Sequence, residues 1–205
     1  MTAGQSEHIL LFWETKVANH HSAITRFSTT SPKVYIVATR DIEPGEEITI
    51  SCRLPQPNSQ NTLLTASDTE WDMESEERRS RLRRWGFECQ CSLCAGPEEA
   101  LQASDRRRSE IAELKEEVVN VLQKGRFYRA IKITKDIIRL MEEEGLTPLL
   151  STQYDTIGRI YWAINDKVNA EVYARKRVDM LVKFGFAEAG KEDSEVKKVL
   201  LSYND

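Results

Sequence analysis

Apolar residues follow two different spacings along the chain, β-type in the first half and helical in the second. The run Val34 to Ala38 is β-branched and apolar, which predicts a buried strand. Another strand is expected around Ile24 to Phe27, and Ile48 to Cys52 alternates apolar with polar residues as a half-buried strand does. Between the last two runs, Pro44 and Gly45 occupy turn positions, because proline fixes φ and glycine tolerates a positive φ. The first half therefore predicts short strands joined by turns.

Beyond Gly96-Pro97 the apolar residues return every three or four positions, which predicts helices almost to the end. The expected helices are one that carries the apolar residues of 111–122 and stops at Lys124-Gly125, one over 127–144, one opened by Pro148, one over 169–184 and a short one over 192–201. Ala130 and Ala170 stand forty residues apart, each at the start of the second helix of a pair. This spacing is a weak signal of a tetratricopeptide-like repeat, and an unrepeated helical bundle is the alternative.

Two segments connect these halves. Residues 53–67 contain two prolines and many amides and hydroxyls, a composition that buries too little apolar surface to order itself, so a flexible insert is expected. From Asp72 to Trp85 the pattern is helical, with glutamates early and arginines late, an order that suits the helix dipole. The arginines of 78–84 are interpreted as a solvated helix face, with a nucleic-acid patch as the disfavoured alternative.

Composition narrows the class of protein. The chain has 205 residues, 40% hydrophobic and 30% charged, which is ordinary for a soluble protein and enough for one large or two small domains. A net charge of −4 argues against a chain-wide nucleic-acid footprint. The apolar run Ile9 to Trp13 is too short to span a bilayer or to act as a signal peptide, so an intracellular protein is expected.

Three of the four cysteines form the motif Cys89-x-Cys91-x2-Cys94 at the junction of the two halves. Thiols this close on an irregular segment converge on a common centre, and tetrahedral Zn²⁺ is their natural occupant. A chance cluster or a partial disulfide is the alternative. Grouping at metal-ligand spacing also fits a reducing compartment such as cytosol or nucleus. The adjacent His20 and His21 invite a metal interpretation as well, with a solvated turn as an equal alternative.

Two longer segments carry a family resemblance. VYIVATRDIEPGEEITIS, then SEERRSRLRRWGFECQCSLC, then paired helices resemble the second half of a SET-domain protein lysine methyltransferase of the SET-and-MYND type. The resemblance covers roughly residues 19 to 190. It implies a zinc-binding post-SET segment after the SET strands, and a helical domain like tetratricopeptide repeats packed over the substrate cleft.

The resemblance also implies roles for individual residues. Asn19 and His20 match the family's Asn-His pair, which contacts S-adenosylmethionine, and Trp85 and Phe87 match aromatic positions beside the cofactor's adenine. The zinc ligands of the family's post-SET motif are matched by Cys89, Cys91 and Cys94. The family chemistry is transfer of a methyl group from sulfonium to a neutral lysine amine. Because lysine has a reference pKa of about 10.4, the enzyme needs a dry channel that favours the neutral amine.

Three departures from the family pattern reduce the expected activity. Cys52 stands where the family has the tyrosine that orients the amine, and a thiol is a weak hydrogen-bond partner on a shorter arm. The fourth zinc ligand is open between Cys52 and His21. The family's opening strands, with the glycine-bearing cofactor segment, and its MYND module are not found in the sequence. A mis-joined gene model and a real insertion in a decayed paralogue both explain the insert together with Cys52.

These observations predict an α+β chain in three parts: residues 1–84 as the C-terminal part of a SET domain, 85–97 as a post-SET zinc-binding segment, and 98–205 as an all-α, tetratricopeptide-like domain. The expected function is S-adenosylmethionine-dependent protein-lysine N-methylation, weak or absent in this chain. The alternative is a non-catalytic, zinc-stabilised protein-interaction module. A protein or peptide partner is expected, with histones as one candidate, in nucleus or cytoplasm. Membrane binding and direct nucleic-acid binding are not expected.

Overall fold

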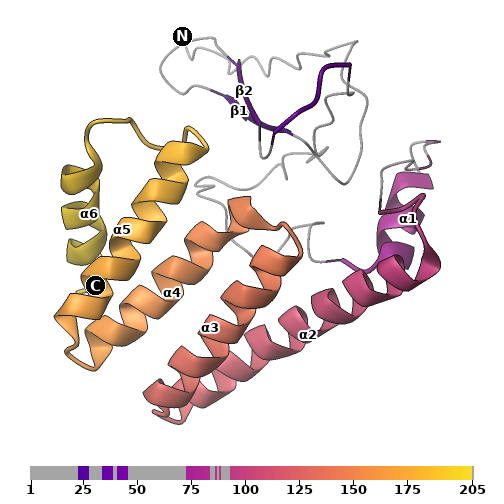
Figure 1. The fold of residues 1–205 in the computed structure, drawn as a ribbon. Coiled ribbons are helices and arrows are strands. Elements are labelled where there is room, and N and C mark those ends of the chain that lie inside the picture. Colours follow the sequence, from indigo (N-terminus) through magenta and orange to yellow (C-terminus); the bar gives the residue numbers. More distant parts are fainter. Residues whose placement is uncertain are drawn as a thin grey trace, which may run out of the picture.

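The structure is a computed structural model that describes residues 23–27, 34–38, 41–45, 73–83, 86, 88 and 93–204. The expected strand Ile48 to Cys52 and the expected insert at 53–67 lie outside the described residues. Most of the described residues belong to a β-hairpin, a short helix and a long helical region (Figure 1).

The two predicted strands are confirmed and pair with each other. β1 (Ala23–Phe27) and β2 (Val34–Ala38) run antiparallel, with Ala23 opposite Ala38 and Phe27 opposite Val34. Their β-branched and aromatic residues suit a pleated surface. The predicted turn after β2 is also confirmed, and Gly45 adopts a φ of 86° that a side chain would strain.

The helices follow the predicted boundaries closely. They are α1 (Ser75–Arg83), α2 (Glu98–Gln123), α3 (Phe127–Glu143), the 3-10 turn η1 (Thr147–Leu149), α4 (Leu150–Ala163), α5 (Lys167–Lys183) and α6 (Glu192–Leu201). α5 begins two residues earlier than expected because the carboxylate of Asp166 accepts a hydrogen bond from the backbone N–H of Asn169 and caps the helix. The expectation of an all-α region after the cysteine motif is met.

Helices α2 to α5 form two helix pairs related by a forty-residue shift. Gly125 and Asn165 both have positive φ, 66° and 62°, and occupy the turn inside each pair. The following residues, Arg126 and Asp166, each donate a backbone hydrogen bond of 2.9 Å to the carbonyl five positions earlier, which is the Schellman way of ending a helix. Each pair also ends at a glycine with positive φ, Gly145 and then Gly185. The forty-residue spacing inferred from Ala130 and Ala170, both fully buried, is therefore present in the backbone.

One hydrophobic core runs through the two pairs. α2 packs on α3, α3 on α4, α4 on α5 and α5 on α6, so the helices form a series of neighbours (Figure 1). Ile111, Ile137 and Ile157, one from each of α2, α3 and α4, are at most 1% exposed. A second, smaller cluster joins Ala174 and Val178 of α5 to Val196 of α6. No helix among the described residues has the length and apolar content that crossing a membrane requires.

The interpretation of α1 as a solvated face needs one correction. Glu76 and Arg83 are exposed, but Arg78 is 1% exposed, and its Nη1 donates a hydrogen bond to the carbonyl of Met73. The sequence did not predict this burial, because a run of charged residues does not show which side of the helix packs against other residues. α1 begins at Ser75, the residue that is hydrogen-bonded to α2.

Candidate functional site

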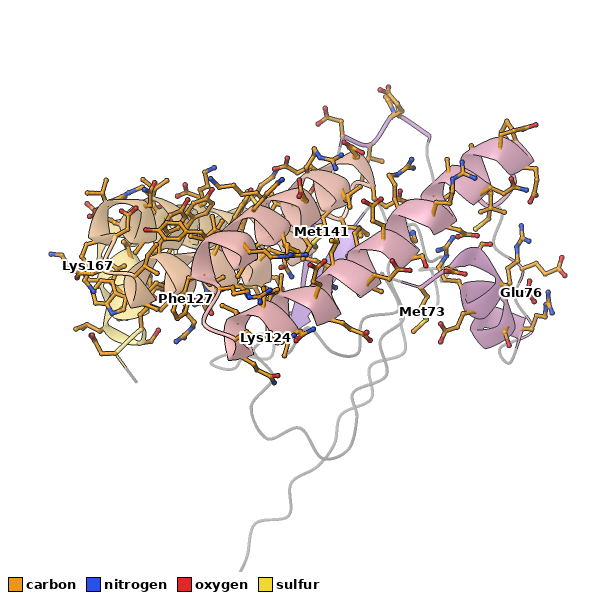
Figure 2. All side chains as sticks on the ribbon, turned by 90° about the horizontal axis from the view of Figure 1, so that it is seen from below. Met73, Glu76, Lys124, Phe127, Met141 and Lys167 are labelled. Atoms are coloured by element: carbon orange, nitrogen blue, oxygen red, sulfur yellow. The ribbon has the colours of Figure 1, made fainter. Side chains whose placement is uncertain are left out.

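The predicted cysteine motif lies in the connection between α1 and α2, and these two helices are bonded to each other. The backbone N–H of Ser75 donates to Oδ1 of Asp105 at 2.7 Å, and the Ser75 hydroxyl donates to Oδ2 at 2.5 Å. Asp105 therefore caps the first turn of α1 from the side of α2. These two bonds fix the start of α1 against α2, on either side of the segment that carries the cysteines. Figure 2 shows Met73 and Glu76 at this end of the molecule, far from Lys167.

Cys94 is the predicted zinc ligand that the structure describes, and it sits in a tight turn just before α2. Its side chain is half-buried and its thiol is in no disulfide. The backbone N–H of Gly96 donates to the carbonyl of Leu93 at 3.3 Å, and Arg79 of α1 donates from Nη2 to the carbonyl of Cys94 at 3.4 Å. Pro97 then starts α2, and its carbonyl accepts from Leu101 at 3.2 Å. The turn, α1 and α2 therefore fix the backbone at Cys94.

The other predicted site residues lie outside the described residues: Asn19, His20, His21, Cys52, Trp85, Phe87, Cys89 and Cys91. Within the described part of the chain, no group of three metal-binding side chains occurs. Gly86, between the two aromatic positions, is described. Its φ is 67°, and its N–H donates to the carbonyl of Arg83 at 3.0 Å, so α1 ends in a glycine turn directly before the motif.

Arg78 is the most buried charged side chain near this connection. Its Nε and Nη2 have no hydrogen-bond partner among the described residues. The carbonyl that accepts from Nη1 of Arg78 belongs to Met73, just before α1. This hydrogen bond joins the residues before α1 to the helix.

A second group of polar residues lies across α3, α4 and α5, and we call it the tyrosine–lysine cluster: Lys135, Tyr154, Tyr161, Tyr173 and Lys176. The rings of Tyr161 and Tyr173 stack with centroids 5.6 Å apart and planes 14° apart. Tyr154 lies 6.2 Å from Tyr173 in a tilted arrangement. The Nζ of Lys135 is 5.9 Å from the Tyr161 ring, and that of Lys176 is 5.2 Å from the Tyr173 ring. Distances of this order are those of cation–π contacts.

The electrostatics of the cluster follow from this packing. The Tyr161 hydroxyl raises the pKa of Lys135, so its ammonium form is favoured. Burial raises the pKa of Tyr173 and of Tyr154, and the Glu142 carboxylate, 3.5 Å from the Tyr154 hydroxyl, adds to the rise for Tyr154. At neutral pH the cluster therefore holds the Lys135 ammonium group near the uncharged phenols of Tyr154 and Tyr173.

Tyr154 and Tyr161 lie in the predicted helix that Pro148 opens, whereas the sequence pattern did not single out the two lysines. The tyrosines are buried, at 7% and 8% exposed. Lys135 and Lys176 lie on different helices forty-one positions apart, and no periodic pattern in one helix connects them. The forty-residue repeat was the one available signal, since it places α3 and α5 in equivalent roles.

Comparison with protein families finds a match in the first quarter of the chain. The model of the SET domain family matches residues 6–53. The match includes Asn19, His20 and Cys52, and it supports a SET-domain protein, whose family function is protein lysine methylation with S-adenosylmethionine. Comparison with curated proteins gives no match.

Proposed function

We propose that this chain carries part of a SET domain of the SET-and-MYND type, whose function is S-adenosylmethionine-dependent protein-lysine N-methylation, joined to a helical interaction domain of tetratricopeptide type. The observation that carries the proposal is the SET match at residues 6–53, which spans the Asn-His pair and ends one residue after Cys52. The order of parts supports it as well, because the cysteine motif and the helix pairs follow in the family's order.

The predicted site residues would have different roles in the reaction. Asn19 and His20 would contact the cofactor from one side, and Trp85 and Phe87 would lie against its adenine. S-adenosylmethionine would supply the methyl group as an electrophilic sulfonium. The chain's own task is to hold a neutral lysine amine in line with that group, and such orientation is worth several orders of magnitude in rate.

Cys52 would weaken that orientation step. The family's tyrosine places a hydroxyl near the amine, whereas a thiol is a poor hydrogen-bond partner at a shorter reach. We therefore propose low or no turnover for the chain with Cys52.

We further propose that Zn²⁺ binds at Cys89, Cys91 and Cys94, with Cys52 or His21 as the fourth ligand. The donor set fits this ion, because thiolates with a histidine or a fourth thiolate are the ligands of structural zinc. The geometry around Cys94 favours a stiff attachment, since its turn is bonded to Arg79 and leads directly into α2. Zinc there would fix the SET strands to the helical region.

A non-catalytic scaffold is the second candidate. The observation that favours it is the continuous core through α2, α3 and α4, whose described members all come from the helical region. On either account we propose a protein or peptide partner, of which histones are one candidate, and a nuclear or cytoplasmic location.

Calorimetric titration with S-adenosylmethionine and a methyl-transfer assay on mixed protein substrates test the catalytic proposal. We expect weak binding and little turnover for the natural chain, and a gain of turnover in Cys52→Tyr. Cys52→Ser is the matched control, because it changes the thiol without supplying a phenol. Asn19→Ala in the Cys52→Tyr background should abolish the gain. Failure of Cys52→Tyr to bind cofactor or methylate any protein would leave the scaffold as the better account.

A further inference from the structure

The tyrosine–lysine cluster contains two lysines, Lys135 and Lys176, on two neighbouring parts of the helical region. On the same two helices, Arg129 and Arg139 of α3 and Arg175 of α5 each pair with a carboxylate, at 2.5 Å, 2.7 Å and 2.9 Å. Within the described part of the chain, neither Lys135 nor Lys176 forms an ion pair, and both side chains are exposed. Two exposed lysines with no ion pair among the described residues therefore lie beside the same group of tyrosines, in a chain with a net charge of −4.

The tyrosines hold these two cations in place. A free lysine side chain loses rotamer entropy when it is fixed. Lys135 lies over Tyr161, and Lys176 lies over both Tyr154 and Tyr173, at 5.7 Å and 5.2 Å from the ring centres. Because the rings restrict the lysines before any partner arrives, part of this entropy is already lost, and pre-organisation of this kind favours binding.

The cluster also joins the two helix pairs. Lys135 comes from the first pair, and Tyr154, Tyr161, Tyr173 and Lys176 come from the second. The stacked pair Tyr161–Tyr173 lies between the two cations, since Lys135 contacts one ring and Lys176 the other. An extended anionic chain that crosses from α3 to α5 would meet both ammonium groups in turn.

We infer that the tyrosine–lysine cluster is a docking surface for an acidic peptide segment, whose carboxylates would pair with Lys135 and Lys176. Charge complementarity selects this partner, because charge-assisted hydrogen bonds are about twice as strong as neutral ones. Single-stranded nucleic acid also brings anions, but it binds by stacking its bases on open aromatic faces. Here Tyr161 is 8% exposed and its ring is stacked on that of Tyr173, so Tyr161 offers no open face for a base.

This inference deepens the proposed peptide partner, and it rests on that proposal only for the existence of such a partner. Its test uses the full chain and a short fluorescein-labelled oligoglutamate peptide, followed by fluorescence anisotropy. The test variant is Lys135→Gln with Lys176→Gln. The matched control is Lys132→Gln with Lys197→Gln, which removes the same charge from exposed lysines of α3 and α6 that lie outside the cluster. The charge-preserving variant Lys135→Arg with Lys176→Arg completes the set.

We expect the glutamine variant of the cluster to bind oligoglutamate about tenfold more weakly, the value for losing about 1.4 kcal/mol of charge-assisted bonding. The matched control should change affinity less than about twofold, and the arginine variant should retain binding. An equal loss of affinity in the matched control would mean that only the total charge of the chain matters, and it would overturn the inference. So would absence of binding by the natural chain at about millimolar peptide.

Two further measurements complete the test. Labelled oligothymidine of the same length should bind more weakly than oligoglutamate, and equal binding that depends on the same lysines would overturn the assignment to peptide. Circular dichroism checks that each variant folds, and the single variants Lys135→Gln and Lys176→Gln replace the double variant if it does not. The cofactor titration is a separate measurement, so a failure here leaves the methyltransferase proposal untouched.

Discussion

The hydroxyl oxygen of Tyr203 lies 2.5 Å from the point that a Cβ atom on Gly158 would occupy. Gly158 is in the interior of α4, where glycine is otherwise unfavourable. Its lack of a side chain lets the residues after α6 settle on α4, where the ring of Tyr203 also lies 6.1 Å from that of Trp162. The indole N–H of Trp162 donates to Oδ1 of Asn204 at 3.2 Å, and Arg159 donates to the carbonyl of Ser202 at 2.9 Å.

Gly158→Ala should therefore destabilise the helical region in spite of alanine's higher helix propensity. Overpacking costs about 1–3 kcal/mol, against a propensity gain of about 1 kcal/mol. We expect a net loss in the free energy of unfolding measured with urea. In a Tyr203→Ala background the clash is gone, so the same change should stabilise. A Gly158→Ala effect of the same sign in both backgrounds would contradict the contact.

Tyr203 should also make stability depend on alkaline pH. Burial raises the pKa of Tyr203, and the carboxylate of Asp155 adds to the rise. The neutral phenol is therefore favoured in the folded state, while the unfolded chain ionises near its ordinary pKa of about 10. Because the folded state then binds more protons, this contribution is complete below about pH 10 and is lost as the pH rises above it.

We expect the free energy of unfolding to fall between about pH 9 and pH 11 more steeply in the natural chain than in Tyr203→Phe. Tyr154 and Tyr173 are unchanged in both proteins, so the difference isolates Tyr203. At neutral pH the phenylalanine variant should be as stable as the natural chain or more so, because the buried hydroxyl has no hydrogen-bond partner among the described residues. Parallel pH curves would contradict the assignment.

Glu144 should be the most sensitive carboxylate between α2 and α3. Its side chain is 3% exposed, and it accepts from Nε of Arg108 at 3.1 Å and from Nε of Arg107 at 2.7 Å. It also accepts from the hydroxyl of Ser104, which is fully buried. Breaking a buried pair by removing one partner costs about 3–5 kcal/mol.

Glu144→Ala is therefore expected to lower the free energy of unfolding by about 3–5 kcal/mol. Glu143→Ala is the matched control, one position earlier. Its partner Arg139 and Glu143 itself are each about half exposed, so that change should cost about 0–1 kcal/mol. Similar losses in the two variants, measured by urea unfolding, would show that the buried network contributes no special stability.

These contacts mark the limit of prediction from the sequence. The boundaries of α6, β2 and the turn at Gly45 were predictable, because local periodicity and turn residues determine them. The pair Glu144 and Arg108 was not, since polar residues thirty-six positions apart carry no shared pattern. The burial of Arg78 could not be predicted for a similar reason. A run of charged residues predicts an exposed helix face, and only the tertiary contacts determine which side is buried.

The residues of the candidate site could be predicted from the sequence, but their arrangement in space could not. The Cys-x-Cys-x2-Cys spacing predicted a metal site from ligand chemistry alone. That Asp105 would fix the start of α1, and so position the segment before Cys94, required the tertiary contact between α1 and α2. Lys135 and Lys176 become neighbours of one aromatic group only after α3, α4 and α5 pack.

The helical region should fold by itself as a fragment of residues 97–205. Its core is internal to α2 through α6, and the described contact that it loses is the pair of hydrogen bonds from Ser75 to Asp105. Each such bond contributes about 1 kcal/mol. We expect helical circular dichroism and one cooperative melt. A random-coil spectrum, with the full chain remaining helical under the same conditions, would contradict this independence.

Zinc binding gives the last prediction, and it rests on the proposed metal site. Purified chain should contain about one zinc ion, as a closed structural site does. Cys91→Ser should abolish it, because the loss of one thiolate opens the site. Chelation should disorder the segment between α1 and α2 while leaving the melt of fragment 97–205 unchanged, since metal binding and local folding are coupled.

Cys52→Ser and His21→Ala decide the fourth ligand. Whichever residue binds the ion, its replacement should weaken zinc affinity about as much as Cys91→Ser does, and the other replacement should leave it unchanged. Affinity is measured by competition with a chromophoric chelator, with apparent free energies of about 10–16 kcal/mol expected for a structural site at pH 7. Zinc content well below one ion per chain in protein purified without chelators would contradict the proposed site.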